Sequence, residues 1–278
     1  MSPKHVKIVL SVGALILFVL LFIAPKVVSS EKANNLNEMA NKPAAVNLNA
    51  TIQLYLDMAS KALDPALKTQ NDSYIKLASQ QTTYFDSLAK FWDKAKRPDI
   101  ASLYLEQKAS KTKKADDWFV AGNRYYYSVQ FVKDETERPI LFQSAIRSFK
   151  NGLQIEPNNI DSKIMMASCY VEGTEAPMDG ITLLKEVERV DSNNVKLQLT
   201  FAFLSVKSGQ TNKAIARFNK VLKLDPTYIE AYLHLADIYE QMNNLDKTIE
   251  ALENYASKTN DPTAKIEVEK YIKQLKLK

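Results

Sequence analysis

The sequence is poor in the residues from which most catalytic, redox and metal sites are built. It contains two histidines, one cysteine and six glycines in 278 residues. A single cysteine excludes a disulfide within the chain. Neither the HExxH metal-binding pattern nor the GxxxxGK phosphate loop occurs. We therefore predict a protein that is not an enzyme and that holds no cofactor or metal ion.

The sequence also lacks the alternating apolar and polar runs of β-strands and a strong excess of one charge. Hydrophobic residues make up 46% of the chain and charged residues 25%, and the formal net charge is +5. These proportions, together with the few glycines, favour an all-α fold in one extended domain. The lysines are scattered and are not interleaved with stacking aromatic residues, so we do not expect nucleic-acid binding.

One long hydrophobic run is present, and it lies near the N-terminus. Residues 8–24 read IVLSVGALILFVLLFIA and carry no charge. As a helix this run would be about 25 Å long, which is close to the hydrocarbon thickness of a bilayer. We predict a single transmembrane helix over 8–24, preceded by a short cytoplasmic tail at 1–7. A cleaved signal peptide is the alternative, because Val28 and Ser30 are small residues that could precede a cleavage site.

The lysines around this run do not decide its orientation, because two precede it and Lys26, Lys32 and Lys42 follow it. The basic tail and the lack of a later apolar run favour export of the C-terminal part. Lys-rich, Arg-poor and Asn-rich usage is typical of an A/T-rich bacterial genome. Together with the apolar run and the expected export, it predicts a single-pass protein of the bacterial inner membrane with its C-terminal part in the periplasm. A cytosolic orientation is the alternative. Residues 25–48 read as a flexible tether with a reach of roughly 25 Å.

A pattern with a period of 34 residues fills the C-terminal half, beginning at Val195 and again at Ile229. The copy from Val195 has large and small apolar residues, a glycine and a final proline at fixed positions: Phe201, Ala202, Gly209, Ala214, Phe218 and Pro226. The next copy matches at Tyr232, Leu235, Ala236, Tyr239 and Leu252, with Thr248 in place of a small alanine. This pattern resembles the tetratricopeptide repeat (TPR) family, in which each unit forms a pair of antiparallel helices.

Weaker copies extend the resemblance toward the N-terminus. They contain Met166, Ala167 and Tyr170; Trp118, Gly122 and Phe149; and Phe85, Leu88 and Trp92. In the copy with Trp118 a long excursion that includes QFVKDETERP separates the two helices. We expect five units over 82–262, forming a superhelical TPR solenoid, and we expect Cys169 to be a buried apolar residue.

Additional helices are expected at the two ends of the array. Two helices over 49–81 are predicted to cap the N-terminal end, and the stripe of the second, which begins near Asn71, runs on to Trp92. A last helix over 263–278 is predicted to cap the C-terminal end, with Ile266, Tyr271 and Leu275 facing inward.

The resemblance implies protein binding, because TPR arrays bind partner proteins on a concave surface formed mainly by the first helix of each unit. The candidate partner-binding residues at the family's positions are Phe119, Asn123, Tyr126, Tyr127, Ile164, Ser168, Leu199, Phe203, Lys207, Leu233, Asp237 and Glu240. An apolar groove with acidic residues at one end suits an amphipathic helix or an extended peptide. The alternative is that packing within the array buries some of these side chains.

Three functions are compatible with these features. The first is a membrane-anchored scaffold for an envelope protein complex. The second is a chaperone-like accessory of protein export, because the expected topology resembles the periplasmic TPR subunit that accompanies the bacterial Sec translocon. The third is a regulator whose catalytic partner is another chain. A carboxylate clamp is not expected, since Ile164, Met165 and Thr200 stand where clamp members of the family carry polar or basic residues.

Overall fold

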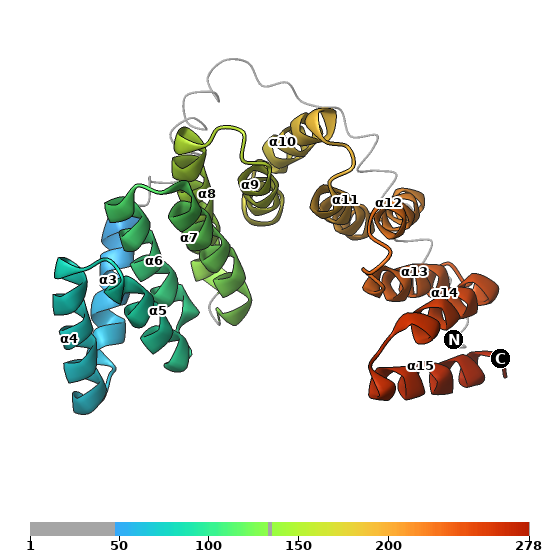
Figure 1. Cartoon of the computed structure of the whole chain (residues 1–278), viewed down its shortest axis with the longest axis horizontal. Coiled ribbons are helices and arrows are strands. Elements are labelled where there is room, and N and C mark those ends of the chain that lie inside the picture. The colour runs from blue at the N-terminus through green and yellow to red at the C-terminus, as the bar shows by residue number, and fades with distance from the viewer. Residues whose placement is uncertain (1–47, 133–134, 278) are drawn as a thin grey trace, which may run out of the picture. The chain divides into compact units, whose positions relative to one another are not determined.

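The computed structural model describes residues 48–132 and 135–277, and these residues form helices joined by short connections (Figure 1). The predicted tail and transmembrane helix lie outside the described residues, as does the tether except for Leu48, which begins the first described helix. Within the described part of the chain, no helix combines the length and the apolar character needed to cross a bilayer.

Thirteen α-helices follow one another in the described residues, and two short 3-10 helices lie between α7 and α8. The elements are α3 (Leu48–Lys61), α4 (Pro65–Gln80), α5 (Tyr84–Lys94), α6 (Pro98–Thr112), α7 (Ala115–Ser128), η1 (Val129–Phe131), η2 (Glu135–Glu137), α8 (Arg138–Ile155), α9 (Ile160–Gly173), α10 (Pro177–Val190), α11 (Val195–Lys207), α12 (Thr211–Leu224), α13 (Glu230–Gln241), α14 (Leu245–Lys258) and α15 (Pro262–Leu275).

Asparagine side chains mark the start of several of these helices. Oδ1 of Asn159, Asn194 and Asn244 accepts a hydrogen bond from the backbone amide three residues later, at 2.9, 3.0 and 3.2 Å. The first amides of a helix lack partners within the helix, so each cap satisfies a group that would otherwise depend on water. The caps therefore fix where α9, α11 and α14 begin, and with them the phase of the repeat.

The helices pack in consecutive pairs, as the 34-residue period predicts. The pairs are α5 with α6, α7 with α8, α9 with α10, α11 with α12, and α13 with α14. Fully buried alanines lie at the close contacts, among them Ala121, Ala145, Ala167, Ala202 and Ala214. Small side chains let two helices approach, and the larger neighbours fill the remaining space. The prediction of an all-α solenoid of helix pairs is confirmed for the described residues.

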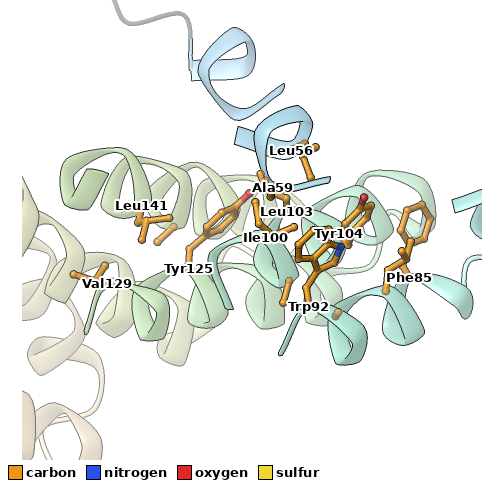
Figure 2. Close-up of a cluster of buried hydrophobic side chains, with 14 of the residues drawn as sticks. Leu56, Ala59, Phe85, Trp92, Ile100, Leu103, Tyr104, Tyr125, Val129 and Leu141 are labelled. Atoms are coloured by element: carbon orange, nitrogen blue, oxygen red, sulfur yellow. The ribbon is translucent and has the colours of Figure 1, made fainter. Parts of the chain in front are cut away.

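The apolar core is divided into three clusters along the array. The largest extends from α3 to α9, and Figure 2 shows Ala59 of α3 next to Ile100 and Leu103 of α6 within it. A second cluster extends from α11 to α15, and a small third cluster joins α9, α10 and the start of α11. In α11, Leu197 belongs to the third cluster and Ala202 to the second. The core is therefore interrupted near α11.

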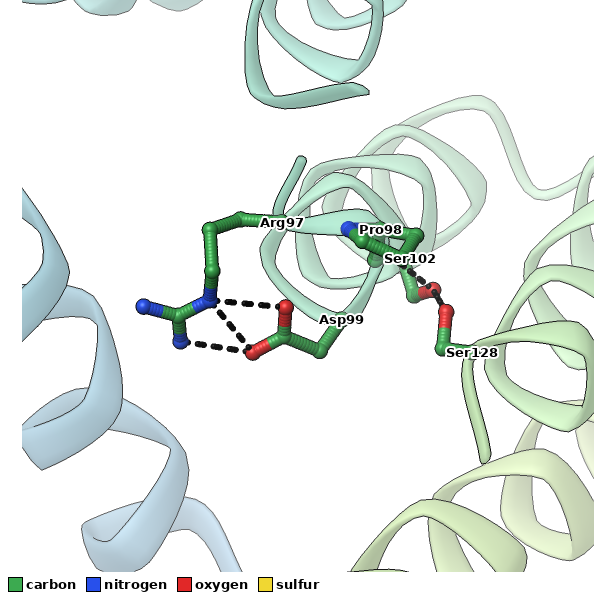
Figure 3. A network of polar contacts seen from close by, with 5 residues as sticks. All are labelled: Arg97, Pro98, Asp99, Ser102 and Ser128. Atoms are coloured by element: carbon green, nitrogen blue, oxygen red, sulfur yellow. Dashed lines mark hydrogen bonds and ion pairs between the residues drawn. The ribbon is translucent and has the colours of Figure 1, made fainter. Parts of the chain in front are cut away.

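Polar contacts supplement this core where α6 meets α7. The Ser102 hydroxyl donates to the Pro98 carbonyl at 2.8 Å, and its oxygen lies 3.1 Å from the Ser128 hydroxyl of α7 (Figure 3). At the start of α6, the Arg97 guanidinium binds both oxygens of Asp99, with a shortest distance of 2.7 Å. Small hydroxyl side chains thus replace alanine at this contact without leaving their oxygens unpaired.

The N-terminal helices differ from the prediction. The expected single helix from Asn71 to Trp92 is wrong, because the chain turns at 81–83 and forms α4 and α5. The helix also begins earlier than Asn71: Pro65 occupies its first turn and the Asp64 carboxylate accepts from the Leu67 amide at 2.9 Å. Asn71 is buried instead, and its Oδ1 accepts from the Trp92 indole at 3.1 Å. The turn is what brings these two residues together.

The C-terminal helix α15 packs on α14, but part of its predicted inward face is wrong. Leu275 is buried and Tyr271 is half-buried, whereas Ile266 is 66% exposed. Ile272, which follows Tyr271 in the sequence, is buried where Ile266 was expected to be. Val268, Ile272 and Leu275 are spaced three and four residues apart, so they share the helix face that meets α14.

Candidate functional site

The twelve predicted partner-binding residues lie on four helices, α7, α9, α11 and α13, which are the first helices of consecutive units. Helix α9 contacts both α7 and α11, so these helices lie side by side (Figure 1). The structure therefore gathers the predicted residues on neighbouring helices, but it exposes only part of the set.

Two predicted residues are not available to a partner. Ile164 is 0% exposed and Ser168 is 7% exposed. Ile164 packs with Ala167, Leu184 and Leu197 in the small cluster that joins α9, α10 and α11. The prediction that Ile164 and Ser168 line a binding surface is wrong, because α9 has a packed neighbour on each side.

The remaining ten residues divide into two groups by exposure. Phe119, Asn123, Tyr126, Leu199 and Leu233 are half-buried, and Tyr127, Phe203, Lys207, Asp237 and Glu240 are exposed. Four of the half-buried members, Phe119, Tyr126, Leu199 and Leu233, pack one side against the core and leave part of their surface accessible. An incoming side chain would therefore meet a surface that is already held in place.

Tyr126 connects two units of the array. Its hydroxyl donates to Glu172 Oε1 of α9 at 2.7 Å, and its ring lies edge-on to Phe142 of α8 with centroids 6.1 Å apart. Burial and the Glu172 carboxylate both raise the pKa of the Tyr126 hydroxyl, so it stays protonated and donates this bond. Tyr126 is therefore mainly an interunit contact, which leaves less of it for a partner than its place among the predicted partner-binding residues implies.

Phe203 is the predicted partner-binding residue whose ring position is best defined by its neighbours. Its ring lies edge-on to Phe218 at 5.5 Å and to His234 at 4.9 Å, while Phe218 and His234 stack at 5.0 Å. Phe218 is fully buried, yet Phe203 remains 44% exposed. Contacts with α12 and α13 thus fix an aromatic ring whose outer surface is accessible.

His234 is a member of this group that sequence reasoning missed. It lies on α13, and its side chain is half-buried against Phe203 and Phe218. Burial lowers the pKa of the imidazole, while the nearby Asp237 and Glu230 carboxylates oppose that shift. A usable signal was the repeat itself: Phe203 and Asp237 are equivalent positions, and His234 lies one helical turn before Asp237.

A second accessible aromatic group lies at the end of α7. The rings of Tyr127 and Phe131 are 5.0 Å apart, and the two residues are 47% and 52% exposed. The Arg124 guanidinium lies 5.3 Å from the Tyr127 ring centroid and also pairs with Asp93 of α5. Phe131 belongs to the excursion QFVKDETERP, so its pairing with Tyr127 could not be read from the repeat pattern.

Charged residues on the first helices are partly engaged with neighbours. Lys196 pairs with Asp161 at 3.0 Å and lies 5.4 Å from the ring centroid of Phe119. Glu240 accepts a hydrogen bond from the Tyr271 hydroxyl at 2.5 Å, which ties α13 to α15. Asp237 accepts a hydrogen bond from Gln241 of its own helix at 3.0 Å. Because this bond is local, Asp237 is the predicted acidic residue best placed to meet a partner.

The described residues contain no group of three or more histidine, cysteine, aspartate or glutamate side chains that could hold a metal ion. Cys169 is fully buried, as predicted, and burial raises the pKa of its thiol. A protonated, inaccessible thiol is a poor nucleophile. The exposed residues on the first helix of each unit can therefore bind apolar and basic side chains of another molecule.

Comparison with known proteins is consistent with the observed helix pairs. A family profile described as TPR repeat matches residues 205–243, which contain α12 and α13. A TPR protein of known structure from Parabacteroides merdae has a TM-score of 0.53 at 13% identity, over 83% of this chain and 86% of its own. A thermophilic TPR protein from Thermus thermophilus has a TM-score of 0.50 at 17% identity, over 70% of this chain and 99% of its own. No curated protein matches in sequence. The likeness to solved structures shows a TPR fold.

Proposed function

We propose that this protein is a membrane-anchored scaffold whose first helices bind a peptide-like segment of a partner protein. The observation that carries the proposal is Phe203, an aromatic ring held by Phe218 and His234 and still 44% exposed. Aromatic residues that are fixed before binding lose little conformational freedom and supply much of the affinity at protein interfaces.

The surroundings of Phe203 favour a segment that carries both apolar and basic side chains. Leu199 and Leu233 are half-buried on α11 and α13, and Asp237 is exposed one turn beyond Leu233. An apolar side chain of the partner would contact the Phe203 ring, and a basic one would pair with Asp237. The exposed Tyr127 and Phe131 rings supply a second contact for a longer segment.

The anchoring part of the proposal rests on the uncharged run at 8–24. A helix of that length would hold the array within the roughly 25 Å reach of its tether from the bilayer. We propose that the protein lies in the inner membrane of a bacterium with the array in the periplasm, because the run has a basic tail before it and no later apolar run occurs in the sequence. A role in protein export differs from a scaffold in its partners: a chaperone binds many unfolded chains weakly, and a scaffold binds one folded partner.

The experiment that tests the proposal is crosslinking and purification of the full-length protein from its own membranes. The wild type should recover one partner complex, and the double variant Tyr127→Ala with Phe203→Ala should lose it. Each anchor is expected to contribute about 1 kcal/mol or more, and the loss should appear mainly as faster dissociation. Lys223→Ala, at an exposed position of α12, is the matched control and should bind as the wild type does.

Three outcomes would contradict this function. A folded double variant that retains its partner would show that another face binds. A double variant that unfolds would show that the rings belong to the core. Recovery of many unrelated unfolded chains would support the export role in place of the scaffold.

A further inference from the structure

A cleft separate from the Phe203 group opens between the third and fourth helix pairs. It has a volume of about 520 Å³ and is lined by residues of α10, α11 and α12 and by Val171 near the end of α9. Its apolar lining includes Ile181, Phe201 and Leu204, all half-buried. A cleft of this size falls within the range that holds a small ligand or a few side chains.

The cleft lies where the third and fourth pairs meet over a small apolar cluster only, which joins α9, α10 and α11. The clusters that involve α9–α11 and α11–α15 are distinct, and α10 packs on α11 much less than α8 packs on α9. A polar contact connects the two pairs beside the apolar cluster: Arg217 of α12 binds Glu188 of α10 at 2.5 Å and the buried Gln198 of α11 at 2.7 Å. The Arg217 guanidinium also lies 4.5 Å from the Phe201 ring centroid.

The charge at this cleft is positive. Arg217 and Glu188 neutralise each other, which leaves Lys185, Lys207 and Lys213 as exposed cations on the lining. Within the described ranges, no ion pair involves any of these three lysines. Lys213 donates to the amide oxygen of Gln210, a neutral group, at 2.6 Å. Three unneutralised ammonium groups around an apolar floor favour an anionic ligand with an apolar part.

We propose that this cleft docks an acidic segment of a partner protein, which inserts an apolar side chain against Phe201 and Leu204 and pairs its carboxylates with the lysines. A protein segment fits better than a bilayer, because the apolar residues form the floor of a cleft between helices and not a convex surface. The site goes beyond the function proposed above. Lys207 borders both surfaces, but Asp237 selects a basic residue beside Phe203, whereas Lys185 and Lys213 select acidic residues at this cleft.

The test measures binding of three fluorescein-labelled synthetic peptides to the full-length protein in detergent by fluorescence anisotropy. All three peptides carry the same two leucines one helical turn apart, flanked by glutamates, lysines or serines. The glutamate peptide should bind more tightly than the serine peptide, and raising the salt from about 50 mM to about 500 mM should weaken it severalfold, because exposed charges are screened. Binding of the lysine peptide belongs to the Phe203 surface and should be lost in Phe203→Ala.

Two kinds of variant locate the site. Lys185→Glu with Lys213→Glu should weaken the glutamate peptide at least about tenfold by placing like charges opposite its carboxylates. The control, Lys223→Glu with Lys270→Glu, makes the same charge change at exposed positions of α12 and α15 and should have an effect within about twofold. Ser208→Trp fills the cleft from its exposed rim without changing charge and should weaken the peptide by about the same factor as the first pair. Thermal melting of each variant verifies folding.

The proposal is wrong if the glutamate peptide does not bind, or if both the charge pair and Ser208→Trp leave its affinity unchanged. If the protein forms dimers and Lys185→Glu with Lys213→Glu abolishes them, the cleft binds a second copy of this chain. If the protein binds anionic vesicles but not the peptide, the cleft binds lipid. Either result overturns the proposal. Phe203→Ala should reduce recovery of the partner complex but not the affinity for the glutamate peptide, so failure here and failure of the proposed function are distinguishable. Loss of glutamate-peptide affinity in Phe203→Ala would assign that peptide to the Phe203 surface and would overturn this proposal.

Discussion

Three buried hydroxyl groups in this array, of Ser102, Ser128 and Thr248, are paired within the helical turn to which they belong. The hydroxyls of Ser128 and Thr248 donate to the carbonyl four residues earlier, at 2.7 and 2.9 Å. Such a bond lets a polar side chain occupy a small-residue position, which explains why Thr248 is tolerated where alanine is preferred. In contrast, the buried hydroxyl oxygens of Ser144 and Ser148 of α8 have no hydrogen-bond partner within the described residues. These two unpaired hydroxyls therefore lower the stability of the fold.

Ser148→Ala should accordingly stabilise the protein. Removing a buried unpaired hydroxyl relieves a desolvation penalty of about 1 kcal/mol or more, and alanine is the better helix former. The measurement is the denaturation midpoint of the full-length protein. Thr248→Ala is the control, because its hydroxyl is paired and its removal should give no gain. A lower midpoint for Ser148→Ala would show that the hydroxyl has a partner in solution.

His234 should make stability depend on pH. Burial lowers its folded pKa, so the unfolded chain binds more protons below the unfolded value of about 6.5. The stabilisation is thus present above about pH 6.5 and is lost as the pH falls through that value. The melting temperature should drop between about pH 7.5 and pH 5.5, and less so in His234→Gln. His5 is the one other histidine of the chain, so an equal drop in both proteins would assign the effect elsewhere.

Ala202 should not tolerate a larger side chain. It is fully buried between helices of the second cluster, so Ala202→Trp should overpack the contact and destabilise the protein by about 1–3 kcal/mol or more. Ala216→Trp, at an exposed position of the neighbouring α12, is the matched control. Chemical denaturation of the two variants compares them, and equal midpoints would show that Ala202 is not at a close contact.

At the scale of helices, glycine allows the closest approach within a pair. A Cβ atom added to Gly180 of α10 would lie 2.4 Å from the carbonyl oxygen of Ala167 in α9. That distance is far below van der Waals contact, and the obstacle is backbone that cannot rotate away. Gly209 has a different role: its φ of +69° forms the turn between α11 and α12, and an added Cβ would meet nothing within 4 Å. One glycine thus serves packing and the other serves backbone conformation.

Gly180→Ala and Gly209→Ala should accordingly lower the free energy of unfolding by different amounts. Gly180→Ala must push α9 and α10 apart and should destabilise by about 1–3 kcal/mol, as overpacking does. Gly209→Ala places a side chain in the left-handed region and should cost about 1 kcal/mol. Calorimetric melting distinguishes them, and a larger loss for Gly209→Ala would reverse the assignment.

At the scale of the whole molecule, the described array and the apolar run at 8–24 make separate predictions. The full-length protein should stay with membranes after carbonate washing, because an uncharged helix of that length just spans a bilayer. Deletion of residues 1–47 should release the array into the wash. Carbonate release of the full-length protein would favour a cleaved signal peptide. Protection of the array from protease in osmotically opened cells would place it in the cytosol.

The amino-acid sequence alone predicted the helix pairs and much of their interior. A 34-residue period with small residues at fixed positions defines which side of each helix meets its partner, and Ala202, Phe149 and Cys169 are buried as that pattern requires. The boundary between capping helices and repeats was predicted at 81–82, but the second helix was read across it to Trp92, because apolar residues on either side of the turn at 81–83 continue one helical stripe.

Only the tertiary structure decided which residues of the predicted surface are accessible. Periodicity gives the direction of a side chain about its own helix, whereas exposure depends on the distance to the next helix pair. Ile164 is buried because it packs against Leu184 of α10 and Leu197 of α11, and Phe203, which the same rule selected on α11, is 44% exposed. The cleft between α10 and α12 has the same origin: it depends on how closely two helix pairs approach, and side-chain packing between units sets that distance.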